Sequence, residues 1–209
     1  MMGQNRSSAV MQQRTEAHDS LDDFPTPPWA TRALCDYIAA RFPGPPLSGQ
    51  ICREPAANRG HMVAPLREYF RHVEASDVHD YGAGFALSDY LLGADPVGVV
   101  GWTITNPPFR LAEQFIQQAR NTSQNGVAML VRSAFLEGVG RHGRLFSVGP
   151  PSDILQFTER VVIHKGTLSA KGSTATAYCW LVWRPGYDGT RFDWISPCRK
   201  RLERASDYD

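Results

Sequence analysis

Gly98-Val-Val-Gly-Trp-Thr-Ile-Thr-Asn-Pro-Pro-Phe109 is an apolar stretch, rich in β-branched residues, that ends in two adjacent prolines. A run of this kind is typical of a buried strand in a parallel sheet. Pro107 and Pro108 each fix a φ angle and lack a backbone N–H, so the chain cannot continue as a helix or a paired strand. The stretch therefore predicts a buried strand that ends in a rigid loop.

The rigid loop would present hydrogen-bond acceptors in fixed positions. The side-chain oxygen of Asn106 and the carbonyl of Pro107 come just before the flat ring of Phe109. An amine attached to an aromatic ring has two N–H donors, so the ring could stack on Phe109 while both donors are bound. For the tetrapeptide alone, a purely structural turn containing two prolines is the alternative.

Strands and helices are expected to alternate on both sides of this stretch. The segments 50–53, 71–76 and 126–131 predict strands, and the apolar spacing in 30–42, 111–120 and the segment up to Phe70 predicts helices. Thr26 is the expected N-cap of the first helix. Two further strands, 154–164 and 176–183, are joined by a polar, basic loop and predict an antiparallel hairpin.

These elements predict an α/β fold: a doubly wound, mostly parallel sheet closed by an antiparallel hairpin, with ligands at its carboxyl edge. We expect residues 1–22 to be a disordered lead-in, residues 23–185 to form one catalytic domain and residues 186–209 to be a C-terminal tail containing a basic cluster. A chain of 209 residues with 42% hydrophobic content can bury one substantial core.

Composition excludes several classes of protein. No apolar run is long enough to span a bilayer and no secretion signal is visible, so we expect a cytoplasmic protein without a membrane partner. The four cysteines are far apart and form no Cys-x-x-Cys pair, which indicates neither a metal site nor a disulfide framework. A formal charge of +1 requires that any basic groups used to bind nucleic acid be arranged locally.

Asn106-Pro-Pro-Phe109 after an apolar strand resembles the catalytic tetrapeptide of S-adenosylmethionine-dependent amino-methyltransferases, especially N6-adenine DNA methyltransferases of the phage or prophage type. The resemblance covers residues 24–185. It implies a class I, Rossmann-like methyltransferase fold, S-adenosylmethionine as the cofactor and no metal. The catalytic residues that it implies are Asn106, Pro107, Pro108 and Phe109.

The resemblance also assigns the cofactor site. Thr26-Pro27 would lie at the methionine end, and the turn from Glu54 to Gly60 would wrap the amino-acid part. Asp77, at the tip of the second strand, would bind the ribose hydroxyls, with Asp80 as the alternative. The full set is Thr26, Pro27, Glu54, Pro55, Ala56, Asn58, Gly60, Asp77, Asp89 and Tyr90. Asn58 stands where the family often has glycine, and asparagine tolerates left-handed backbone best after glycine.

The target is expected to be an adenine in DNA, bound by Phe109, Phe135, Lys165 and Lys171. Phe135 could equally be a core residue, and the two lysines could belong to an ordinary exposed loop. An RNA adenine methyltransferase, a protein glutamine methyltransferase and a non-catalytic cofactor-binding subunit are the alternatives. No segment is left over for a recognition domain, so a homodimer or a partner subunit is a further possibility.

Overall fold

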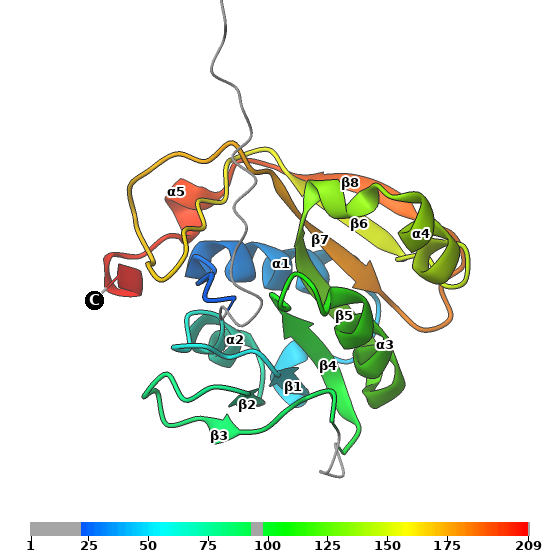
Figure 1. The fold of residues 1–209 in the computed structure, drawn as a ribbon, viewed down its shortest axis with the longest axis horizontal. Coiled ribbons are helices and arrows are strands. Elements are labelled where there is room, and N and C mark those ends of the chain that lie inside the picture. The colour runs from blue at the N-terminus through cyan, green and yellow to red at the C-terminus, as the bar shows by residue number, and fades with distance from the viewer. Residues whose placement is uncertain (1–21, 93–97, 209) are drawn as a thin grey trace, which may run out of the picture.

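A central sheet of eight strands organises the computed structural model, which describes residues 22–92 and 98–208. The strands lie in the order β3-β2-β1-β4-β5-β7-β6-β8. Strand β7 runs antiparallel to its neighbours β5 and β6, and the other neighbouring pairs are parallel. The doubly wound sheet with a closing antiparallel hairpin is therefore confirmed (Figure 1).

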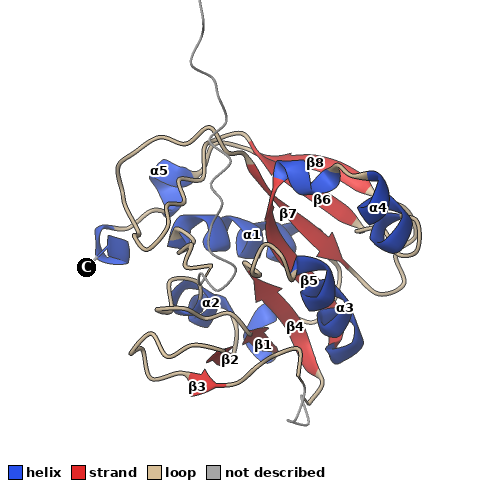
Figure 2. Ribbon diagram, viewed as in Figure 1, coloured by secondary structure: helices blue, strands red, loops and turns tan. Residues whose placement is uncertain are grey.

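Strands and helices alternate from α1 to β2 and from β4 to β6, whereas no α-helix separates β2, β3 and β4 or β6, β7 and β8 (Figure 2). The strands are β1 (Ile51–Glu54), β2 (His72–Asp77), β3 (Ala86–Leu87), β4 (Val100–Thr105), β5 (Ser123–Arg132), β6 (Asp153–Phe157), β7 (Tyr178–Trp183) and β8 (Arg191–Ile195). The α-helices are α1 (Pro28–Arg41), α2 (Val63–Tyr69), α3 (Ala112–Thr122), α4 (Val139–Arg141) and α5 (Arg199–Leu202). Short helical turns cover Leu47–Gly49, Ser133–Leu136, His142–Phe146 and Ala205–Tyr208.

Each face of the sheet has its own apolar core. Residues of α1 and α2 pack against one face with Trp102, Ile104 and Trp180, whereas α3 packs against the other with Met129 and Leu181. The two sets alternate along β5 and β7, as side chains of successive strand residues must. The sheet is thus covered on both sides, and its loops remain at the strand ends.

Several expected boundaries were wrong. The N-cap of α1 is Pro27, with no side-chain cap, because the hydroxyl of Thr26 accepts a hydrogen bond from Asn106 instead. The strand expected over 154–164 ends at Phe157, after which Val161, Val162 and Ile163 are buried without forming a strand. The two-residue strand β3 was not expected.

The segment expected to be a C-terminal tail is part of the fold. Strand β8 pairs with β6 along its whole length, and Leu202 of α5 belongs to the core that α1 lines. The buried guanidinium of Arg32 in α1 donates to the Leu202 carbonyl and forms ion pairs with Glu68 and Asp207. The lead-in expected over residues 1–22 lies outside the described residues except for Asp22, whose carboxylate binds the Phe109 amide.

Candidate functional site

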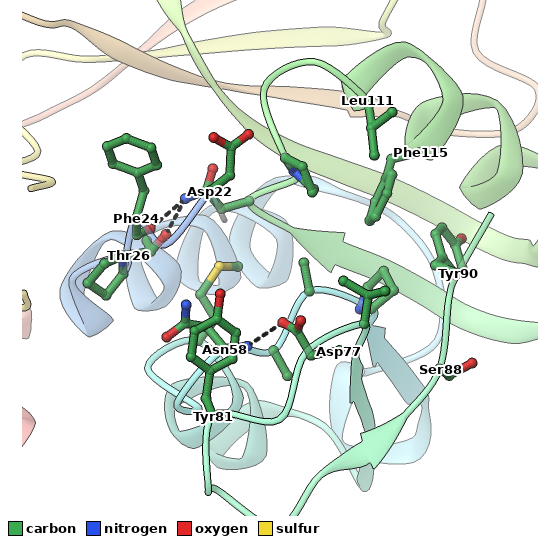
Figure 3. Close-up of a pocket in the computed structure, with 18 of the residues that line it drawn as sticks. Asp22, Phe24, Thr26, Asn58, Asp77, Tyr81, Ser88, Tyr90, Leu111 and Phe115 are labelled. Atoms are coloured by element: carbon green, nitrogen blue, oxygen red, sulfur yellow. Dashed lines mark hydrogen bonds between the residues drawn. The ribbon is translucent and has the colours of Figure 1, made fainter. Parts of the chain in front are cut away.

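The carboxyl ends of β1, β2 and β4 lie side by side, and a cleft opens above them. Parallel strands direct their following loops to one edge, where ligands of doubly wound sheets bind. Glu54 ends β1, Asp77 ends β2, and Asn106 follows β4 directly. The cleft is lined by Asp22, Phe24, Pro25, Thr26, Pro55, Ala56, Ala57, Asn58, His61, Met62, Asp77, Val78, Tyr81, Ser88, Asp89, Tyr90, Leu91, Asn106, Pro108, Leu111 and Phe115 (Figure 3).

The turn after β1 is tight. Asn58 adopts a left-handed conformation with φ 49°, and Gly60 follows with φ 91°. A Cβ atom on Gly60 would lie 2.9 Å from the Phe85 ring, so the position has no room for a side chain. Asparagine and glycine, the residues that best tolerate a positive φ, therefore occupy the two positions where the backbone has one. The turn brings Ala56, Ala57 and Asn58 to the cleft wall.

Asp77 is fixed at the cleft wall by backbone donors. Its carboxylate accepts hydrogen bonds from the amides of Asn58, at 2.9 Å, and His79, at 3.0 Å (Figure 3). The residue is 9% exposed and lines the cleft. A carboxylate oxygen can accept more than one hydrogen bond, so Asp77 keeps capacity for a ligand hydroxyl.

Asp89 and Tyr90 also line the cleft. The Asp89 carboxylate accepts from the amides of Leu91 and Leu92, and the Tyr90 ring packs on Phe115 with ring centroids 5.1 Å apart. Asp80, the alternative to Asp77, is exposed, accepts from the Gly82 amide and is not among the residues that line the cleft.

Asn106 has a fixed amide orientation. Its amide nitrogen donates to the Phe24 carbonyl at 3.0 Å and to the Thr26 hydroxyl at 3.1 Å. The Phe24 carbonyl can only accept, so this bond decides which end of the amide is the donor, and the Thr26 hydroxyl accepts from the same nitrogen. The side-chain oxygen is buried and has no hydrogen-bond partner within the described residues. Such an unpartnered acceptor is unusual in folded proteins and marks a place where a donor can bind.

Glu54 lies beneath the same corner. One carboxyl oxygen accepts from the Thr105 hydroxyl, at 2.6 Å, and from the Ala56 amide, at 3.0 Å, while the other is buried without a partner in the described chain. Complete burial raises the pKa of Glu54 to about 8, against the lowering effect of these two hydrogen bonds, and nearby Asp77 raises it further. The carboxyl group is therefore mostly protonated near pH 7.

Phe109 lies on the other side of the proline loop. Its backbone amide donates to the Asp22 carboxylate at 2.8 Å, and its ring packs against Phe24 with centroids 4.9 Å apart. With Pro107 and Phe135 it lines a second pocket at the ends of β4 and β5. The proline loop thus separates the cleft from an aromatic pocket.

The structure brings most of the predicted residues to these two pockets. Thr26, Pro55, Ala56, Asn58, Asp77, Asp89, Tyr90, Asn106 and Pro108 line the cleft, and Pro107, Phe109 and Phe135 line the aromatic pocket. Pro27, Glu54, Gly60, Lys165 and Lys171 are not among the residues that line either pocket. Both lysines are exposed, and their role in target binding stays a prediction.

Sequence reasoning missed other residues of the cleft wall, among them Asp22, His61, Met62, Tyr81 and Phe115. Asp22 and Phe24 adjoin the predicted Thr26-Pro27, so proximity in sequence could have indicated them. Within the part of the chain that the structure describes, no group of three or more His, Cys, Asp or Glu side chains could hold a metal ion. No helix among the described residues is long and apolar enough to cross a membrane.

Comparison with known proteins identifies relatives by structure alone. The sequence matches no protein-family model and no curated protein sequence. The fold is similar to a type I restriction-modification methyltransferase subunit from Streptococcus thermophilus, with a TM-score of 0.61 and 11% identity over 91% of this chain and 50% of that one. The chain spans about half of the length of the restriction-modification subunits that it matches.

Two other solved structures have a similar fold. One is a candidate class I S-adenosylmethionine-dependent methyltransferase from Listeria monocytogenes, with a TM-score of 0.59 and 10% identity over 87% of this chain and 70% of that one. The other is a candidate RNA methyltransferase from Pyrococcus horikoshii, with a TM-score of 0.58 and 17% identity over 78% of this chain and 88% of that one. The chain therefore has the class I, Rossmann-like methyltransferase fold.

Proposed function

We propose that this chain is an S-adenosylmethionine-dependent methyltransferase that methylates the exocyclic N6 amine of adenine in DNA. One observation carries the proposal: at the carboxyl edge of the sheet, the Asn106 amide is oriented by Thr26 and Phe24 so that its oxygen is buried without a partner. An incoming N–H donor would satisfy that oxygen. The adjoining cleft leads from Asn106 to the turn at Asn58 and to Asp77.

The cleft fits S-adenosylmethionine on the chemistry of its walls. Asp77 would accept from the ribose hydroxyls, and Tyr90 with Leu91 would cover the adenine ring. The small-residue turn at Ala56 and Ala57, with Pro55 and Asn58, would hold the amino-acid part near Thr26. The Glu54 oxygen that accepts from the Ala56 amide would hold this turn in place, and Gly60 would allow its positive φ. Asp89 would meet the cofactor's adenine amine.

The bound cofactor would supply an electrophilic methyl group for direct displacement by a nitrogen. The residues of this chain would act on that nitrogen, whose lone pair is delocalised into the adenine ring. Hydrogen bonds to the Asn106 oxygen and the Pro107 carbonyl would favour tetrahedral geometry and stabilise the positive charge that develops. Phe109 would hold the extruded base by stacking, and Pro108 would keep the loop rigid. Fixed orientation of both reactants supplies several kcal/mol in well-aligned systems.

The same acceptors suit other amines. An RNA adenine or a protein glutamine amide could occupy the Asn106 corner, and one structural relative is named as a candidate RNA methyltransferase. Because the chain spans about half of the length of the restriction-modification subunits that it matches, a second copy or a partner subunit could supply target recognition. A cofactor-binding subunit without catalysis is the alternative from another class.

The test combines cofactor binding with methyl transfer. Calorimetry measures binding of S-adenosylmethionine, and tritiated methyl transfer is followed to plasmid DNA, total RNA and protein, each identified by DNase, RNase or protease sensitivity. Asn106→Ala should bind the cofactor but lose transfer by about 100-fold or more, the usual effect of removing such an acceptor or donor. Asn121→Ala, at an exposed position at the end of α3, is the matched control.

The outcomes separate the candidates. Label that only DNase removes supports the DNA target, whereas label that only RNase or protease removes replaces it with an RNA or protein target. Cofactor binding without transfer to any of them would support the subunit function. A protein that binds no S-adenosylmethionine would overturn the proposal.

A further inference from the structure

The aromatic pocket beside the proline loop contains two arginines that each cover a phenylalanine ring. Residues of β5, of the loops and turns that follow β4 and β5, and of α3 and α4 line it: Pro107, Phe109, Ala112, Val131, Arg132, Ala134, Phe135 and Arg141. The guanidinium carbon of Arg132 lies 3.9 Å from the centroid of the Phe109 ring. That of Arg141 lies 3.9 Å from the centroid of Phe135. The two contacts look equivalent but differ in what else holds each cation.

Arg141 is fixed in the pocket wall. Its guanidinium donates to the carbonyls of Phe135 and Glu137, each at 2.7 Å, and lies 3.4 Å from the Glu113 carboxylate in α3. Its charge is therefore largely compensated by groups that the fold itself supplies. Arg141 joins the loop after β5 to helix α3.

Arg132 is held by aromatic groups rather than by anions. It is the last residue of β5, is exposed, and lies over Phe109 and 5.8 Å from the Phe24 ring centroid. Burial raises the pKa of the neighbouring Tyr178, and the Arg132 cation opposes that rise. Among residues 22–92 and 98–208, no carboxylate forms an ion pair with Arg132 at 4.0 Å or less. Its charge is thus available to an anionic ligand.

A guanidinium on the Phe109 ring occupies the place where a planar ligand would stack. A base that stacks on that face must displace it, and the cation–π contact of an exposed arginine is weak enough to be broken by a competing ligand. No ion pair within the described chain has to be broken for the arginine to move. The displaced planar cation matches a phosphate oxygen pair, which a nucleotide carries beside its base.

We infer that Arg132 is a target-positioning residue: it covers Phe109 in the free protein and binds the phosphate beside the methylated base when that base enters. This inference rests on the proposed function and narrows the target to a nucleic acid, because a glutamine side chain brings no such anion. A single residue thereby covers a half-buried aromatic ring and links base entry to binding of the nucleic-acid backbone.

A single-stranded oligodeoxyadenylate tests the inference because it needs no recognition sequence and no base extrusion. We would measure its binding by fluorescence anisotropy, with a labelled strand of about 12 nucleotides, at salt concentrations from about 50 to 200 mM. The variants are Arg132→Gln, Arg132→Lys and the control Arg71→Gln, which removes an exposed charge just before the start of β2, at the opposite edge of the sheet. Thermal unfolding of each variant monitors the fold.

Arg132→Gln should weaken binding of the oligonucleotide by about threefold to tenfold. It should also reduce the magnitude of the slope of log affinity against log salt concentration by about 0.7, the value for one lost phosphate contact on a single strand. Arg132→Lys should keep the slope, and Arg71→Gln should change neither quantity. Equal binding by Arg132→Gln and Arg71→Gln would overturn the inference while leaving cofactor binding and methyl transfer untouched. A lysine variant as weak as the glutamine variant would also overturn it, since stacking rather than charge would then explain the effect.

A wild-type protein that binds no oligonucleotide but methylates protein would overturn both the inference and the nucleic-acid target. A wild-type protein that binds the strand through Arg132 but transfers no methyl group would overturn the catalytic proposal alone. The two failures are therefore distinguishable.

Discussion

The amide nitrogen of Asn106 lies 3.1 Å from the hydroxyl oxygen of Thr26, a residue 80 positions earlier in the chain. Thr26 is 2% exposed, so this bond is shielded from water. It supplies one of the two contacts that turn the Asn106 oxygen away from the protein's own donors. The segment before α1 therefore positions the candidate catalytic side chain.

Thr26→Val should slow methyl transfer by about fivefold, because a net hydrogen bond of about 1 kcal/mol that orients Asn106 is lost. Thr26→Ser keeps the hydroxyl and should retain the wild-type rate. Single-turnover methyl transfer at saturating cofactor measures the effect. A valine variant as fast as the wild type would mean that the Phe24 carbonyl alone orients Asn106.

Asp77→Ala should weaken S-adenosylmethionine binding by about 1–3 kcal/mol, or about fivefold to 150-fold in Kd, because the ribose hydroxyls lose their acceptor. Calorimetry measures Kd, and circular dichroism checks the fold because the Asn58 and His79 amides also lose a partner. Asp80→Ala is the control, since that exposed carboxylate is not among the residues that line the cleft. If only the Asp80 variant lost affinity, the ribose contact would be misassigned.

Glu54 should make stability fall as pH rises. Burial raises the pKa of its carboxyl group from 4.5 to about 8 in the folded state. Between these values the folded protein binds a proton that the unfolded chain has released, so the free energy of unfolding decreases with pH, by up to about 1.4 kcal/mol per unit. This contribution is fully present below the unfolded pKa and is lost by about pH 8.

Urea unfolding of wild type and Glu54→Gln from pH 5 to 9 isolates this effect. The difference between the two proteins removes the contribution of all other titrating groups. Glutamine imitates the protonated acid, so the variant should lack this part of the pH dependence. Parallel curves would show that Glu54 is ionised when folded.

Arg32→Ala should lower the free energy of unfolding by about 3–5 kcal/mol, because it leaves the carboxylates of Glu68 and Asp207 without their buried partner. Arg204→Ala removes an exposed partner of the same Glu68 and should cost at most about 1 kcal/mol. Urea unfolding measures both. If the two substitutions lowered the free energy of unfolding equally, burial would not determine how much each arginine contributes to stability.

Sequence patterns predicted the sheet and its closing hairpin because apolar runs of strand and helix period are local signals. Strand β8 could not be predicted in this way. Its five residues alternate Phe192 and Trp194, both exposed, with Asp193, whose carboxylate accepts from the Tyr37 hydroxyl in α1. The Tyr37 hydroxyl, 156 residues away in the sequence, gives the Asp193 carboxylate a hydrogen-bond partner. This partner makes a charged residue compatible with a strand that faces a helix.

The candidate site was predictable to the extent that its residues follow strand ends. Asn106 could be predicted because a strand pattern ends directly before it, and Asp77 could be predicted because it stands at the end of a strand pattern. The contact between Asp22 and the Phe109 amide joins residues 87 positions apart in a polar segment without periodicity. Nothing in the local sequence specifies that a carboxylate there will bind a distant backbone donor.

The packing of α1 on the final elements has a consequence for synthesis on the ribosome. Trp29 and Leu34 share one core with Ile195 and Leu202, and Arg32 binds groups 170 and 175 residues away. Helix α1 is synthesised before these partners and meets them only after residues 195 to 207 have left the exit tunnel. Contacts of such long sequence separation form slowly, so the nascent chain carries an uncovered apolar helix face, which a chaperone could bind until release.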